Sequence, residues 1–115
     1  MPYPHIDSVS FGEIVVRGKS YFSDVAIWWS GKVSLLEKTH IIDEDLVKRI
    51  LVKDTESIII GLGLEGTVKI TPEVRDFLKK KKVGLFLDQT GNAVEIFNAM
   101  LGQGKKSVAL LHVTL

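Results

Sequence analysis

The sequence predicts an α/β fold with a mostly parallel, layered sheet and a β-rich addition at the N-terminus. In the C-terminal half, from Ser57 onward, three short apolar runs alternate with two helix-like segments. Strands and helices in this order form parallel sheets, because right-handed crossovers return each strand to the same sheet. The N-terminal half instead reads as short strands between turns. The chain has 115 residues, the length of one ordinary domain, so we predict a single domain over residues 1–115.

The N-terminal half is expected to contain three strands and then a helix. Apolar residues from Val9 to Val16 keep a two-residue period if Gly12 forms a β-bulge. Asp43 is the predicted N-cap of a helix over residues 44–52, whose apolar residues share one face. The turns and further strands are expected, in chain order, at residues 17–20 (turn), 25–29 (strand), 30–31 (turn) and 33–35 (strand).

The C-terminal half has clearer boundaries. Thr71 followed by Pro72 predicts the start of a helix that ends near Lys81. Thr90 or Asn92 is expected to cap the next helix, which ends at glycine. The strand at residues 83–87 is almost wholly apolar, which predicts cover on both faces, and the last strand is expected at 107–113.

Composition excludes several classes of function. A net charge of +1 gives no support to nucleic acid or anionic lipid as a partner. No apolar run approaches the length of a membrane span and the N-terminus has no signal core. The chain has no cysteine, which fits a reducing compartment, so we predict a cytoplasmic protein. Its three histidines lack metal-site spacing, so no metal and no cofactor are expected.

One motif has the spacing of a dinucleotide-binding loop. Gly61, Gly63 and Gly66 follow an apolar strand as G-x-G-x-x-G, and Asp88 ends the next strand. In a nucleotide site these glycines open a helix whose N-terminus faces the pyrophosphate. Here the β-branched, alternating residues 67–70 follow, and they favour extended chain. We therefore interpret the motif as a glycine-bearing loop and not as a nucleotide site.

Other polar and aromatic residues have a structural and a functional interpretation. Asn98 lies at the margin of the packed face of its helix, where it can tie the helix to a strand or loop, or contact a ligand. His112 lies on the apolar face of the last strand, either as a core residue or as an acid or base. Trp28 and Trp29 point to opposite faces of their strand, so one of them is either covered or free to contact a partner protein. Lysines 79–82 form a solvated helix end, with a small phosphate-contacting patch as the alternative.

The chain resembles an uncharacterised family of small α/β proteins, found in archaea and bacteria. The family includes a mammalian adipogenesis-associated protein and a mitochondrial complex I assembly factor. The resemblance covers nearly the whole chain and rests on the motifs Tyr21-x-x-Asp24, Ile58-Ile59-Ile60-Gly61-x-Gly63, Gln89-Thr90-x-x-Ala93-Val94, Phe97-Asn98-Ala99 and Gln103-Gly104. It implies a three-layer fold around a mixed central sheet. It also implies a shared pocket, formed by the matching positions Gly61, Gly63, Thr90 and Asn98, with His112 as a weaker match.

Two functional hypotheses follow from these observations. The first is a non-catalytic interaction or assembly module that binds a protein partner or forms a homo-oligomer, with Trp28 or Trp29 at the contact. The second is a small-molecule or anion site, with or without catalysis, near Gly61, Gly63 and Thr90. The sequence identifies no catalytic residue, so an enzyme is the less favoured class.

Overall fold

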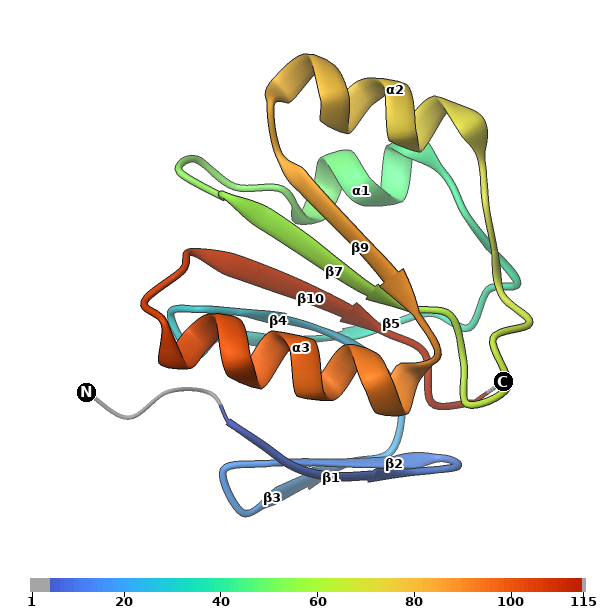
Figure 1. The fold of residues 1–115 in the computed structure, drawn as a ribbon. Helices are drawn as coiled ribbons and strands as arrows, with labels where there is room; N and C mark the ends of the chain where they lie inside the picture. Colours follow the sequence, from blue (N-terminus) through green and yellow to red (C-terminus); the bar gives the residue numbers. More distant parts are fainter. Residues whose placement is uncertain (1–4, 115) are drawn as a thin grey trace.

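The computed structural model describes residues 5–114, which form a five-stranded central sheet between two outer layers (Figure 1). The strands of the central sheet are, in spatial order, β5 (Val33–Leu36), β4 (Asp24–Trp28), β10 (Ser107–Leu111), β7 (Ser57–Gly61) and β9 (Gly84–Asp88). β10, β7 and β9 run parallel, whereas β4 is antiparallel to β10 and β5 is antiparallel to β4. The predicted three-layer α/β fold with a mixed sheet is confirmed.

The helices lie on both faces of the central sheet. α1 (Glu44–Ile50) and α2 (Pro72–Lys81) cover one face, and α3 (Thr90–Gly102) covers the other (Figure 1). From β7 the chain steps through α2 to β9, and it returns through α3 to β10 on the far side of β7. Right-handed crossovers that run in opposite directions across a sheet place their helices on opposite faces, which is the arrangement found.

A separate three-stranded sheet lies beside α3. Its strands are β1 (Ile6–Ser10), β2 (Glu13–Val16) and β3 (Lys19–Tyr21), all antiparallel. The bulge predicted at Gly12 is wrong, because Phe11 and Gly12 form the turn of a hairpin between β1 and β2. Gly12 has a φ of 81°, a left-handed conformation that a turn needs and glycine adopts without strain. β4 and β5 agree with the predicted strands to within one residue. The turn predicted at residues 17–20 is wrong in part, because Lys19 and Ser20 belong to β3, and the short strand β6 (Ile41–Ile42) was not predicted.

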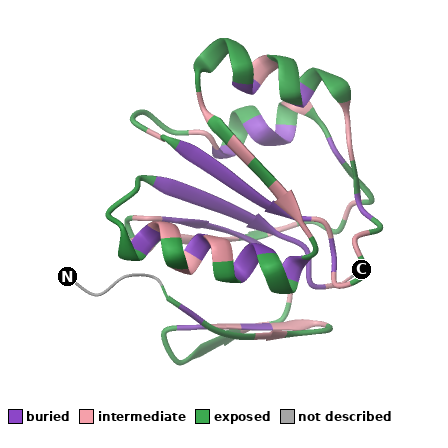
Figure 2. Cartoon of the chain, viewed as in Figure 1, coloured by how far each residue is buried: buried purple, intermediate pink, exposed green. Residues whose placement is uncertain are grey.

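Strict alternation along the central strands divides the core into two halves. Ile58 and Ile60 of β7 face α1 and α2, whereas Ile59 faces α3 and the N-terminal sheet. Every residue of β4, β7 and β10 is buried, and Figure 2 shows β7 and β10 wholly in the buried colour. These three strands are apolar because both of their faces are packed.

β9 differs from this pattern. Its predicted cover on both faces is wrong, since β9 is an edge strand with mixed burial and Phe86 is 38% exposed (Figure 2). An almost wholly apolar run predicts a central strand, but here α2 and α3 cover the edge only in part.

The predicted helix starts are confirmed at α1 and α2. The Asp43 side chain accepts a hydrogen bond from the Leu46 backbone N–H at 2.9 Å. Proline occupies the first turn of α2 as predicted, although Thr71 makes no capping bond through its side chain. The predicted cap of α3 is wrong, because Gln89 is the N-cap and Thr90 is already inside the helix and fully buried.

The chain after the glycine motif is extended, as predicted. Leu64 and Glu65 form a tight turn, and β8 (Lys69–Ile70) then pairs in parallel with β6 (Ile41–Ile42) before α2 begins. Among residues 5–114, no helix is long and apolar enough to cross a membrane. Residues 1–4, part of the segment in which the sequence shows no signal core, lie outside the described residues.

Candidate functional site

The glycine motif contacts a helix, but it is the helix of the next crossover. The Gly63 N–H donates to Thr90 Oγ1 at 3.0 Å, and the Thr90 N–H donates to the Gly63 carbonyl at 2.9 Å. The Thr90 hydroxyl in turn donates to the His112 carbonyl at 2.6 Å. The first turn of α3 is thus joined to the ends of β7 and β10, and we call this group of Gly61, Gly63, Thr90 and His112 the glycine corner.

Both glycines of the corner are required, Gly61 by close packing and Gly63 by its backbone conformation. A Cβ at Gly61 would lie 2.8 Å from Thr90 Oγ1 and 3.0 Å from Thr90 Cα, closer than side chains tolerate. Gly63 has a φ of 95°, which other residues rarely adopt. These requirements account for the first two glycines of the G-x-G-x-x-G spacing without a phosphate ligand.

His112 is fully buried in this corner. Its ring Nδ1 lies 3.2 Å from the Gly61 carbonyl, so Nδ1 carries the proton, and Nε2 has no hydrogen-bond partner among the described residues. Burial lowers the pKa of His112, while the nearby Asp24 charge and the Gly61 carbonyl oppose that shift. The Thr90 proton goes to a backbone carbonyl and not to this imidazole, so the two side chains do not form a nucleophile–base pair.

Asp24 lies beside the glycine corner, and from the sequence it stood out only as part of a resemblance motif, without a role. Its buried carboxylate accepts hydrogen bonds from the Val113 N–H at 2.7 Å, the Thr114 N–H at 3.1 Å and the Thr114 hydroxyl at 3.0 Å. The available signal was an acidic residue directly before a wholly apolar strand, where a buried charge needs several donors.

Asn98 is not part of the glycine corner. Its side-chain amide accepts from the Ile6 N–H and donates to the Ile6 carbonyl, both at 2.9 Å. The amide therefore acts as an additional strand partner for β1 and attaches the N-terminal sheet to α3. Of the five predicted pocket residues, the structure brings four together and leaves Asn98 two turns away along the helix.

Neither tryptophan stands free on the surface. Trp28 is only 7% exposed, and its indole Nε1 donates to the Ile50 carbonyl at 2.8 Å, which joins β4 to α1. Trp29 is half-buried and packs against both halves of the core. The alternatives for the tryptophans were cover by the rest of the fold or exposure to a partner protein, and the structure shows cover. Trp28 also lines a cavity.

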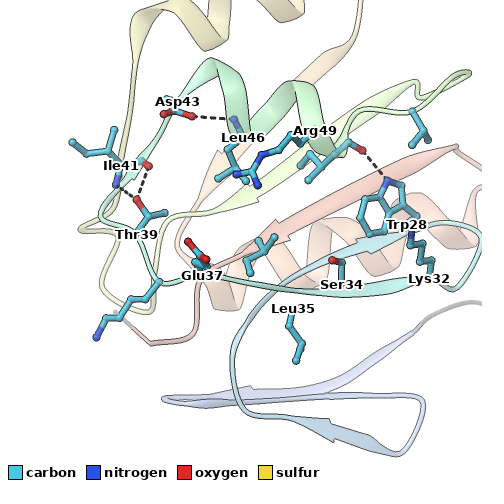
Figure 3. Close-up of a pocket in the computed structure, with 14 residues that line it drawn as sticks. Trp28, Lys32, Ser34, Leu35, Glu37, Thr39, Ile41, Asp43, Leu46 and Arg49 are labelled. Atoms are coloured by element: carbon cyan, nitrogen blue, oxygen red, sulfur yellow. Dashed lines mark hydrogen bonds between the residues drawn. The ribbon is translucent and has the colours of Figure 1, made fainter.

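That cavity lies between α1 and the edge strand β5, and has a volume of about 660 Å³ (Figure 3). We call it the β5 groove. Figure 3 shows Arg49 reaching from α1 into the space above β5, whereas Leu35 points away from α1. The groove is lined by Trp28, Lys32, Ser34, Leu35, Leu36, Glu37, Lys38, Thr39, Ile41, Asp43, Leu46, Arg49, Ile50 and Val52.

The outer edge of β5 is open. The Trp28 N–H donates to the Lys32 carbonyl, and in an antiparallel ladder hydrogen-bonded pairs alternate with non-bonded ones. Val33 and Leu35 therefore fall in the non-bonded pairs, so their N–H and C=O groups point outward. Among residues 5–114, no hydrogen-bond partner occupies those groups.

Apolar side chains are exposed along the same side of the molecule. Leu35 is 62% exposed, Ile41 54% and Val52 45%. This surface cannot be recognised from the sequence, because single apolar residues in polar segments are common and become distinctive only when the fold places them together. Residues 5–114 contain no group of three or more His, Asp or Glu side chains that could hold a metal ion.

The fold and these contacts define a small three-layer α/β domain with an attached antiparallel sheet. The chain belongs to a family of proteins of unknown function, DUF498/DUF598, which it matches over residues 6–112. The predicted membership of an uncharacterised family of small α/β proteins is therefore confirmed.

Solved structures of similar proteins share this fold. A conserved hypothetical protein from Pyrococcus horikoshii is 24% identical, with a TM-score of 0.86 over 96% of this chain and 98% of that chain. A protein from Bartonella henselae described as an outer membrane protein is 24% identical, with a TM-score of 0.82 over 97% and 98%. A Bordetella parapertussis protein is 20% identical, with a TM-score of 0.82 over 98% of each chain. At these identities the likeness shows the fold alone.

Proposed function

We propose that this protein is a non-catalytic interaction module that binds an extended segment of a partner protein along β5. The observation that carries the proposal is an unpaired strand edge directly beside a groove of about 660 Å³. An extended peptide can add a strand to such an edge, with main-chain hydrogen bonds for affinity and side-chain pockets for specificity.

The edge supplies the main-chain part of this recognition. The outward groups of Val33 and Leu35 offer two donors and two acceptors to an added strand. Alternate side chains of that strand would face the groove, where Trp28, Leu36 and Ile50 form an apolar wall. Natural edges are often blocked by a bulge or a proline. Residues 33–36 contain neither, so the edge is limited only by its length of four residues and by the flanking lysines.

The charges around the groove indicate the character of the partner segment. Lys32 and Lys38 flank β5, and Arg49 extends over it. Of the two acids in the lining, Asp43 already caps α1 through its carboxylate, so Glu37 is the only one without such a role. We therefore propose an apolar segment that carries acidic residues.

The resemblance to a mitochondrial complex I assembly factor and to an adipogenesis-associated protein motivates the same class of function. Assembly factors act by holding partner chains, which fits an open edge better than a closed reaction site. We place the interaction in the cytoplasm, because the chain lacks cysteine and has no apolar run that could span a membrane. The alternative, a small-molecule or anion site at the glycine corner, has weaker support, because the polar groups there bond mainly to one another.

The proposal is tested by peptide selection against the intact protein. Random peptides displayed on phage are expected to yield a consensus with apolar residues at alternate positions and at least one acid. The Leu35→Pro variant removes an outward N–H that makes no bond within the fold, and edge strands tolerate proline. Affinity for the selected peptides, measured by fluorescence anisotropy, is expected to fall about tenfold or more.

Leu35→Ala is the matched control, because it removes the same side chain but keeps the N–H. It is expected to weaken binding clearly less than proline does. The absence of any consensus, or equal binding of the selected peptides by Leu35→Pro and wild type, would overturn the proposal. Sedimentation that shows a dimer dissolved by Leu35→Pro would assign the edge to a second copy of this chain instead.

A further inference from the structure

A second cavity, of about 520 Å³, lies where the C-terminal ends of α1 and α2 meet. We call it the lysine pocket. It is lined by Lys48, Leu51, Val52, Lys53, Asp54, Thr55, Phe77, Lys81 and Val83. Three cationic side chains therefore face one acid around an apolar floor, and the remaining lysines of the 79–82 run lie next to it.

Two ammonium groups of this pocket converge on a single aromatic ring. The Nζ atoms of Lys48 and Lys81 lie 5.4 and 5.9 Å from the centre of the Phe77 ring. A ring attracts each cation, but cations held at one ring repel one another, and an anion placed between them removes that repulsion. Lys48 is paired with Glu44 at 2.8 Å, whereas Lys53 and Lys81 form no ion pair with any acid in residues 5–114.

Helix C-termini attract cations, so unpaired carbonyl groups at this end could bind the lysine ammonium groups themselves. The Ile50 carbonyl accepts from the Trp28 indole at 2.8 Å, and the Leu78 carbonyl accepts from the Val83 N–H at 3.0 Å. The Val52 carbonyl accepts from both the N–H and the hydroxyl of Thr55. Since these carbonyls are bonded, the lysine charges remain available to a ligand.

We infer that the lysine pocket binds a small organic anion, with its charged group among Lys48, Lys53 and Lys81 and an apolar or aromatic body on Phe77 and Val83. The volume lies in the range of ordinary small-molecule sites. Lysines act as point charges towards phosphate or carboxylate, and the phenyl ring and valine supply the surface that distinguishes an organic anion from an inorganic one. The lysine pocket shares only Val52 with the lining of the β5 groove, and its test uses neither the selected peptides nor the β5 edge, so the two proposals can fail separately.

The test is an NMR titration of the ¹⁵N-labelled full chain with phenyl phosphate at low ionic strength. Amide shifts are expected to cluster at residues 51–55 and 81–83. Inorganic phosphate is expected to bind at least about fivefold more weakly, because it cannot use the ring. Phe77→Leu should weaken phenyl phosphate binding by a larger factor than inorganic phosphate binding, because only the phenyl group contacts the ring directly.

Removing single charges distinguishes binding in the pocket from non-specific attraction of an anion by lysines 79–82. Lys81→Gln is expected to reduce phenyl phosphate affinity about threefold to tenfold. Lys79→Gln removes the same charge from the same helix end, but Lys79 does not line the pocket, so its effect should be within twofold. Equal effects of the two variants, equal affinity for inorganic and phenyl phosphate, or no saturable binding would each overturn the inference.

Discussion

The glycine corner and the β5 groove lie in the same small domain but differ in whether their polar groups are hydrogen-bonded within the fold. At the corner, the backbone and side chains of Gly63, Thr90 and His112 bond to one another in a buried space. Along β5, backbone donors and acceptors point outward beside exposed apolar side chains. The glycine motif therefore serves the fold, whereas the surface that we propose for a partner lies along a strand with an ordinary sequence.

The difference has a physical origin. A close approach between a helix and a strand end admits few residue types, so it leaves a recognisable pattern such as glycine facing threonine. An open edge uses backbone groups that every residue possesses, so its sequence is ordinary. The contrast predicts that changes at the corner alter stability and leave peptide binding intact, whereas edge variants do the reverse.

The largest expected effect is at Asp24. Asp24→Ala leaves the Val113 N–H buried without an acceptor and removes three further contacts from Thr114. We expect the free energy of unfolding to fall by about 2–4 kcal/mol, measured by urea denaturation. Asp24→Asn retains one acceptor oxygen and should cost less. A loss below about 1 kcal/mol for the alanine variant would contradict the structural role of this network.

A slightly smaller effect is expected at Gly61. Gly61→Ala forces a Cβ against the Thr90 backbone, and overpacking of this kind costs about 1–3 kcal/mol. Gly91→Ala is the matched control on α3, because a Cβ there meets no atom within 4 Å. The control should be neutral or slightly stabilising. If Gly61→Ala retains full stability but loses binding of the selected peptides, then the prediction that the corner determines stability and the β5 edge determines peptide binding is wrong.

The smallest effect concerns pH. Burial lowers the pKa of folded His112 below its ordinary 6.5, so the unfolded chain takes up a proton first as pH falls. The His112 contribution is full above pH 6.5 and is lost as pH falls through the folded pKa, with a slope of at most about 1.4 kcal/mol per pH unit. Unfolding curves between pH 7.5 and 5 should show this slope.

His112→Gln should flatten the pH dependence whatever its effect on stability at neutral pH. His40→Gln changes an exposed histidine and should retain the wild-type slope. A wild-type slope in the His112 variant would show that another group governs the acid response.

Periodicity and capping signals were sufficient for most of the fold. The helix starts at Asp43 and Pro72 follow from local chemistry, and the apolar strands follow from burial on both faces. The failures at Gly12, β9 and the cap of α3 share one cause, because each depends on what lies beside the segment in space. A glycine between two apolar runs fits a bulge as well as a hairpin turn, and only the pairing of β1 with β2 decides.

Of the candidate sites, only the residues with a structural role, such as Asn98, could be predicted from the sequence. Asn98 was expected either to bond its helix to a strand or loop, or to contact a ligand. Its two hydrogen bonds to the Ile6 backbone join α3 to β1, which is the first of these alternatives. The β5 groove and the lysine pocket join residues from distant segments, and no spacing rule connects Arg49 with Ser34 or Phe77 with Lys53. Such surfaces are assembled by topology, so they become visible only in three dimensions.

Val52, just beyond α1, lines both the β5 groove and the lysine pocket, so one short segment is a common wall of the two. Thermodynamic linkage then makes the two occupants dependent on each other whenever either one displaces that wall. The factor by which an anion changes the affinity for a peptide must equal the factor by which the peptide changes the affinity for the anion. Comparing the peptide affinity with and without phenyl phosphate therefore measures any coupling that passes through Val52.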